Sequence, residues 1–118
     1  RHLDPTQYPL AKAWTFPQPV GVIGIVVPWN FPLAMAIQPL ICAFAAGNRA
    51  MIKMSENSNH VTRLLMEVSP RYLPEDKLRF FEDGGGRGPA FTTLPFDHLF
   101  FTGSPQTGSP RCQRWTRI

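Results

Sequence analysis

The sequence predicts an α/β fold: part of an open, mostly parallel sheet with helices on both faces, which this chain carries only incompletely. A nearly continuous run of β-branched residues at 20–27 is typical of a strand covered on both sides. Strand-like and helix-like segments then follow in the order of a sheet built with right-handed crossovers. The 118 residues are 43% hydrophobic and 17% charged, which is a globular composition.

The segments after the first strand have local patterns of their own. Residues 33–46 are rich in Ala, Leu and Met and end at Gly47-Asn48, so we expect a buried helix with a left-handed stop. Pro39 should kink this helix or confine its regular part to one side. Residues 49–54 are expected to form the second strand.

A second helix is expected after the capping residues 55–58, and Pro70 should interrupt it. Its apolar face has helical spacing and comprises Val61, Leu64, Leu65 and Val68. Residues 77–82 and 98–101 are expected to be further strands. The glycine-rich segment 83–88 between them is interpreted as a flexible turn near a ligand.

Charge and hydropathy exclude two function classes. The net charge is +4, but three of the twelve basic residues crowd into the last eight positions, which leaves nine basic against eight acidic residues elsewhere. Nucleic-acid binding is therefore not expected. Residues 13–48 carry no charge, yet the prolines inside this stretch oppose a membrane-spanning helix, so no membrane association is expected.

The cysteines and histidines give no metal-binding spacing. Cys42 and Cys112 form neither a metal motif nor a disulfide framework, which favours a cytoplasmic location. Cys42 lies in an apolar run and is expected to be buried and inert. His60 is expected on the polar side of its helix and His98 in a strand, and neither is a candidate base.

Open parallel sheets bind ligands at the carboxyl ends of their strands, which directs attention to residues 28–32, 55–56 and 103 onward. Four motifs occur there or nearby in a fixed order, namely Pro28-Trp29-Asn30-Phe31-Pro32, Ala45-Ala46-Gly47-Asn48, Lys53 with Glu56, and Phe101-Thr102-Gly103-Ser104. Over residues 20–108 the sequence thereby resembles the NAD-dependent aldehyde dehydrogenases, whose cofactor domain is Rossmann-like. Residues 53–56 and 82–89 look most like the coniferyl aldehyde dehydrogenase branch.

The resemblance implies that Asn30 donates its amide to the oxygen that becomes negative when a thiolate attacks an aldehyde. Such a donor changes a rate by roughly 10²–10³. An asparagine between two prolines could instead satisfy its own turn.

The resemblance further assigns Lys53 and Glu56 to the ribose hydroxyls of the cofactor. A carboxylate there repels a 2′-phosphate, which favours NAD over NADP. The alternative is an exposed pair at a helix start, where Glu is favoured in any case.

The remaining cofactor contacts are also implied by resemblance. Gly103 and Ser104 should open a helix whose amino end holds the pyrophosphate. The other expected contacts are Val27, Pro28, Trp29 and Gly88. No metal is expected, and intact relatives are expected to be homo-oligomers that bind NAD and an aldehyde.

The family's reaction needs a cysteine nucleophile and a general-base glutamate, which the resemblance places downstream of Ser104. Residues 109–118 lack the expected apolar helix, and we hypothesise a reading-frame slip near Gly108. The expected organisation is an irregular segment at 1–19, a partial NAD-binding domain at 20–108 and an aberrant tail at 109–118. The chain alone should be inactive, poorly soluble and weak in NAD binding, and a non-catalytic binding or interaction remnant is the alternative.

Overall fold

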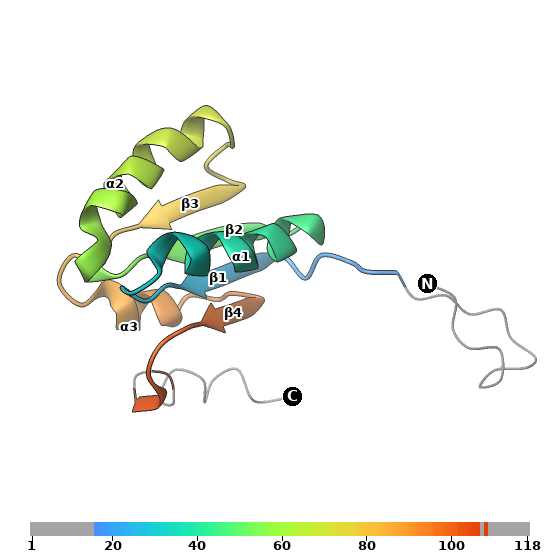
Figure 1. Cartoon of the computed structure of the whole chain (residues 1–118). Coiled ribbons are helices and arrows are strands. Elements are labelled where there is room, and N and C mark those ends of the chain that lie inside the picture. The colour runs from blue at the N-terminus through green and yellow to red at the C-terminus, as the bar shows by residue number, and fades with distance from the viewer. Residues whose placement is uncertain (1–15, 107, 109–118) are drawn as a thin grey trace, which may run out of the picture.

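The computed structural model describes residues 16–106 and 108. Within them, four strands form one parallel sheet in the order β3-β2-β1-β4 (Figure 1). The strands are β1 (Val22–Val26), β2 (Arg49–Lys53), β3 (Leu78–Phe81) and β4 (His98–Phe101). The helices are α1 (Pro32–Ala45), α2 (Asn59–Val68) and α3 (Arg87–Thr92), with short 3₁₀ turns η1 (Glu56–Ser58) and η2 (Ser69–Arg71).

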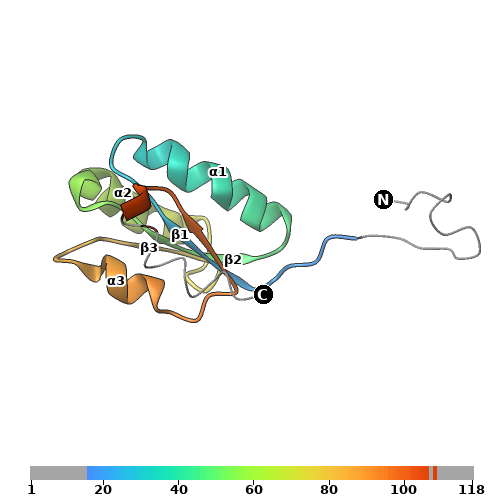
Figure 2. The same ribbon diagram turned by 90° about the horizontal axis from the view of Figure 1, so that it is seen from below.

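The helices cover both faces of the sheet, as predicted (Figure 2). The chain moves from β1 to β2 to β3 in one direction across the sheet, and α1 and α2 therefore lie on the same face. It then crosses back to β4 beyond β1, and the reversed direction puts α3 on the opposite face. This is the arrangement that right-handed crossovers require.

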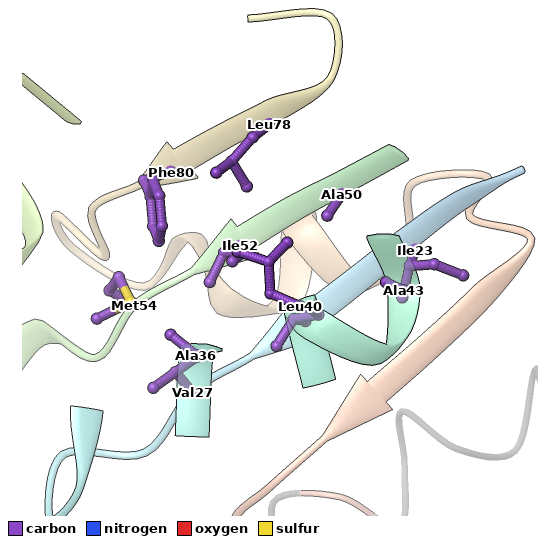
Figure 3. Close-up of a cluster of buried hydrophobic side chains, with 11 residues drawn as sticks. Ile23, Val27, Ala36, Leu40, Ala43, Ala50, Ile52, Met54, Leu78 and Phe80 are labelled. Atoms are coloured by element: carbon purple, nitrogen blue, oxygen red, sulfur yellow. The ribbon is translucent and has the colours of Figure 1, made fainter. Parts of the chain in front are cut away.

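The larger core lies between the sheet and helices α1 and α2 (Figure 3). Ile25 and Ile52, from the two central strands, are completely buried. The helix α1 contributes Ala36, Leu40 and Ala43, whose spacing places them on one side. On the other face, a smaller cluster joins Val26 to Phe91 and Phe96.

Gly24 is required where β1 meets this smaller cluster. A β-carbon at Gly24 would lie 2.6 Å from the ring of Phe96, which is closer than real contacts allow. The absent side chain thus lets Phe96 pack directly on the central strand.

The first strand begins at Val22 rather than at Val20. Asn48, which is buried, accepts the backbone N–H groups of Val20 at 2.7 Å and Gly21 at 3.0 Å through its Oδ1. Its Nδ2 donates to the carbonyl of Ala43 at 3.2 Å. The strand therefore starts only after the chain has been fixed to the end of α1, where Gly47 supplies the predicted left-handed stop with φ +85°.

The first helix departs from expectation at two residues. α1 continues through Pro39, so this residue does not confine the helix to one side, while a kink there stays a prediction. Burial of the apolar face against the sheet outweighs the lost backbone hydrogen bond, which costs about 3 kcal/mol. Cys42 is exposed rather than buried, because Leu40 and Ala43 occupy the inward positions of that turn.

The second helix buries a face that is displaced from the predicted one. Val61 and Leu65 pack on the core, but Leu64 is 60% exposed. Thr62 takes the central buried position, and its hydroxyl donates to the carbonyl of Ser58 at 2.8 Å. The hydroxyl of Thr62 thus has a hydrogen-bond partner within its own helix. With Thr62 facing the core, Leu64 faces solvent.

Helix α3 replaces part of the turn expected at residues 83–88. It begins after Gly86, whose φ is +83°, and it buries Gly88 and Phe91. The sequence did not predict this six-residue helix, because its first turn contains glycine and proline, which have low helix propensity. None of the helices in residues 16–106 has the length and apolar character that a membrane crossing requires.

Candidate functional site

The segments that follow the strands meet at one edge of the sheet. The arrowheads in Figure 1 point to this edge, because every strand pair is parallel. The ladders extend past the strand ends: Val27 N–H donates to the carbonyl of Lys53 at 3.0 Å, and Thr102 N–H donates to that of Val26 at 3.2 Å. The loop after β1 therefore lies between the loops after β2 and β4. The strand order reverses between β1 and β4, which is where open sheets of this kind bind ligands.

The loop after β1 turns abruptly from core to solvent. Val27 is buried and Pro28 is partly covered, whereas Trp29 is 66% exposed. Asn30 is exposed, and its side chain forms no hydrogen bond with any residue in the described ranges. The residue that precedes α1 is Phe31, and Pro32 begins the helix without a side-chain cap. Thus no contact in the described part supports the alternative in which Asn30 satisfies its own turn.

Lys53 is buried at the last position of β2, with only 6% of its surface exposed. Its Nζ lies 2.5 Å from Oδ2 of Asp83, which follows β3. Lys53 pairs in register with Phe81, the last residue of β3, and Asp83 follows Phe81 by two residues. Asp83 therefore lies just beyond the carboxyl end of these two strands, next to Lys53. The exposed-surface alternative is therefore wrong for Lys53.

Asp83 is partly buried, with 10% of its side chain exposed. Burial alone would raise the pKa of this carboxyl, but the hydrogen bond and charge of Lys53 outweigh burial and lower it. The backbone amides of Arg87 and Gly88, in the first turn of α3, lower the pKa of Asp83 further. Lys53 and Asp83 therefore form a largely buried ion pair in which the carboxyl of Asp83 is held in its ionised form.

Glu56 lies three residues beyond Lys53 and is exposed. Ser55, which is buried, caps the 3₁₀ turn η1 by accepting the N–H of Asn57 at 3.3 Å, and its hydroxyl donates to Glu56 Oε2 at 3.3 Å. The serine thus fixes the start of η1 and orients the neighbouring carboxylate. The carboxyl group of Glu56 is therefore open to solvent and to a ligand.

Gly103 and Ser104 follow β4 and are exposed at the same edge. The N–H of Gly108 donates to the carbonyl of Ser104 at 3.0 Å, so the chain turns helically there. A β-carbon at Gly103 would lie 2.7 Å from the ring of Phe101, so packing also requires this glycine. Gly88, by contrast, is buried in α3.

Cys42 lies away from this edge, on α1. Within residues 16–106, no three His, Cys, Asp or Glu residues are arranged to hold a metal ion. Cys42 and His98 line an apolar groove of about 360 Å³ between α1 and β4. Cys42 is ten residues along α1 from Pro32, which corresponds to about 15 Å. The thiol is thus well removed from Asn30.

A model described as the aldehyde dehydrogenase family matches residues 1–114. The chain belongs to the aldehyde dehydrogenase family. It is 48% identical over 102 residues to a probable coniferyl aldehyde dehydrogenase of Pseudomonas aeruginosa, a match that covers 86% of this chain and 21% of the relative. A coniferyl aldehyde dehydrogenase of a Pseudomonas species is 46% identical over 96 residues, covering 81% of this chain and 20% of the relative. The chain thus spans about a fifth of the length of these relatives.

Solved structures of aldehyde dehydrogenases share the fold. A substrate-bound Staphylococcus aureus AldH superposes with a TM-score of 0.77 at 35% identity and covers 81% of this chain and 21% of that one. A Mycobacterium tuberculosis aldehyde dehydrogenase complexed with NAD⁺ gives 0.69 at 33% identity, covering 83% and 21%. The Rossmann-like sheet predicted from the sequence is therefore confirmed.

Sequence reasoning missed the structural roles of three polar residues. Asn48 and Asp97 fix the amino-terminal end of β1, the latter by accepting the N–H of Val22 at 2.7 Å. Asp83 fixes Lys53. The available signal for Asp83 was its position just after a strand, at the level of Lys53 in the neighbouring strand. The glycines that follow it suggested only flexibility.

Proposed function

We propose that this chain carries the first part of the NAD-binding domain of an aldehyde dehydrogenase that oxidises an aldehyde to a carboxylic acid. One observation carries the proposal: residues 27–30, 53–56 and 103–104 converge at the carboxyl edge of one parallel sheet. The aldehyde proposed is an aromatic one of the coniferyl type, because two relatives with that name are 46–48% identical to the chain.

The residues at this edge fit a dinucleotide. The exposed carboxylate of Glu56, oriented by Ser55, is placed to accept hydrogen bonds from ribose hydroxyls. The backbone N–H groups of Gly103 and Ser104 lie where the strand order reverses, and there they could bind a pyrophosphate. Trp29 and Pro28 present apolar surface beside it. NAD, when bound, would accept the hydride that leaves the aldehyde carbon.

Asn30 is the residue we assign to catalysis. Its amide is exposed and forms no hydrogen bond within the described part of the chain, so it is available to an aldehyde oxygen. As that oxygen gains negative charge, a fixed N–H donor stabilises it, and loss of one such donor lowers kcat about 10²- to 10³-fold.

We further propose that the 118-residue chain is inactive by itself. Cys42 lies about 15 Å along α1 from the edge that carries Asn30 and lines an apolar groove there. Cys112 and the predicted tail lie outside the described residues, as does the proposed reading-frame slip. Cytoplasmic location, homo-oligomeric relatives and the boundaries at residues 19 and 108 also stay predictions.

A non-catalytic interaction role is the second candidate. The apolar groove between α1 and β4, with Ile41 and Phe100 exposed beside it, favours that candidate.

NAD titration of the full chain, followed by saturation-transfer NMR on the nucleotide, tests the two candidates. We expect weak, saturable binding that Glu56→Gln reduces and that Glu75→Gln leaves unchanged. Glu75 is an exposed carboxylate before β3, at the amino end of the sheet, so the control removes the same charge from the other end. Absence of any saturable signal would refute the cofactor role and leave the interaction role. Tight stoichiometric binding would contradict the expected weakness.

A further inference from the structure

Asp83 pairs with Lys53, the positive charge three residues before Glu56. The side chains of Lys53 and Asp83 are 7% and 10% exposed, and their charged atoms are 2.5 Å apart. Glu56, three residues from Lys53, is exposed and adds a negative charge. The formal net charge of the three side chains is −1.

Asp83 holds Lys53 while one of its own oxygens is poorly satisfied. The backbone N–H groups of Arg87 and Gly88 lie close enough to lower the pKa of the carboxyl, but Oδ1 is buried and has no well-formed hydrogen bond in the described ranges. A buried oxygen without a full partner costs stability, so its presence at this position calls for an explanation. The carboxylate stays ionised at neutral pH, because Lys53 and the first turn of α3 lower the pKa of Asp83 despite burial.

Without Asp83, Lys53 would present an uncompensated ammonium at the carboxyl end of β2. A lysine there is a good partner for a phosphate on the 2′-position of the adenosine ribose. With Asp83 in place, the same lysine is held by a carboxylate and offers little net attraction to a dianion. The loop after β3 therefore sets the charge of a residue on β2.

We propose that Asp83 is a specificity-determining residue, which by neutralising Lys53 makes the site discriminate against dinucleotides that carry a 2′-phosphate. This inference rests on the proposed function, because it concerns the ribose end of the same NAD site. Asp83 acts through Lys53, and we assign it no contact with the aldehyde.

The test measures dissociation constants for NAD and NADP with the full chain and with Asp83→Asn. The expected result is that the preference for NAD over NADP falls by about tenfold or more, mainly because NADP binds more tightly, as expected when a lysine charge is released near a phosphate. Asp76→Asn is the matched control. Asp76 is exposed before β3, at the opposite end of the sheet, so this variant removes the same charge and should leave the ratio unchanged.

A second variant, Asp83→Ser, protects the test against a folding defect, since serine keeps a small acceptor before α3. Dispersion of the amide NMR spectrum reports whether each variant is folded. If folded Asp83→Asn or Asp83→Ser binds both nucleotides with an unchanged ratio, Asp83 is only structural and the inference is overturned. If the unmodified chain binds NAD no better than NADP, the inference is overturned while the cofactor role stands. If it binds neither, the proposed function fails as well.

Discussion

The two ends of the sheet use their polar side chains in opposite ways. At the amino-terminal end, Asn48 and Asp97 accept backbone N–H groups of residues 20–22 at 2.7–3.0 Å. At the carboxyl-terminal end, Asn30 and Glu56 are exposed, and Asn30 bonds to nothing in the described part of the chain. Both ends belong to the same strands, so the difference cannot come from the strands themselves.

This difference separates residues that hold the fold from residues left for a ligand. A buried amide that satisfies two backbone donors contributes stability, because its removal leaves those donors unpaired. An exposed amide without a partner contributes little to stability. Two asparagines of one sheet, Asn48 and Asn30, thus have opposite expected effects on stability and on chemistry.

The largest expected effect comes from Asn48→Ala. Loss of two accepted hydrogen bonds and one donated bond in a buried position should lower the free energy of unfolding by about 3 kcal/mol. Urea denaturation followed by circular dichroism measures this change. Asn30→Ala is the matched control and should change the free energy of unfolding by less than about 0.5 kcal/mol. Equal destabilisation by the two variants would remove the contrast between the ends.

Gly24→Ala should have the next largest effect. The added β-carbon would lie 2.6 Å from the Phe96 ring and would force apart the β1–Phe96 contact, at a cost of about 2 kcal/mol. The control is Gly85→Ala, where no atom lies within 4 Å and only the positive φ of +84° opposes a side chain. That strain costs about 1 kcal/mol. A larger loss for Gly85→Ala than for Gly24→Ala would show that packing on β1 is looser than described.

The buried pair at the carboxyl end should appear in the pH dependence of stability. The folded-state pKa of Asp83 lies below its ordinary value of 3.8, so the stability it confers is present above that value and is lost as the pH falls through the folded-state pKa. Between pH 5 and about pH 3, the unfolding free energy should therefore drop more for the unmodified chain than for Asp83→Asn. Urea titrations at each pH measure both slopes. Parallel slopes would mean that Asp83 is not held as a carboxylate by Lys53.

The smallest expected effect on stability is that of Glu56→Gln. Its carboxylate is exposed and receives only a 3.3 Å bond from Ser55, so the unfolding free energy should change by less than about 0.5 kcal/mol. NAD affinity should nevertheless fall in the same variant. A stability loss above 1 kcal/mol would reassign Glu56 to the fold.

Much of this fold follows from local sequence patterns. The buried strand after Gly21 follows from a β-branched run and the stop at Gly47 from a glycine, and the structure confirms both, together with the strand predicted at residues 98–101. Leu64 and Cys42 were misplaced because the rotation of a helix on a sheet depends on its packing partners. Helix α3 was missed because tertiary contacts of Phe91 outweigh the weak propensity of its first turn.

The sequence predicted where the candidate site lies but not which of its side chains pair with one another. The rule for parallel sheets and the resemblance located residues 27–30, 53–56 and 103–104 correctly at one edge. The pairing of Lys53 with Asp83 joins residues thirty positions apart in sequence, and only strand register brings them together. Register between parallel strands is set by long-range packing, which a single sequence does not display.

The most direct test of the account is residue-resolved NMR of the full chain during NAD titration. We predict amide shift changes at Val27, Trp29, Asn30, Glu56 and Gly103, with those of Asn48 and Asp97 unchanged. That result would place the nucleotide at the carboxyl edge and leave the amino-terminal end as scaffold. Shift changes concentrated around Asn48 and Asp97, or none at NAD concentrations that saturate weak sites, would contradict a nucleotide site at the carboxyl edge.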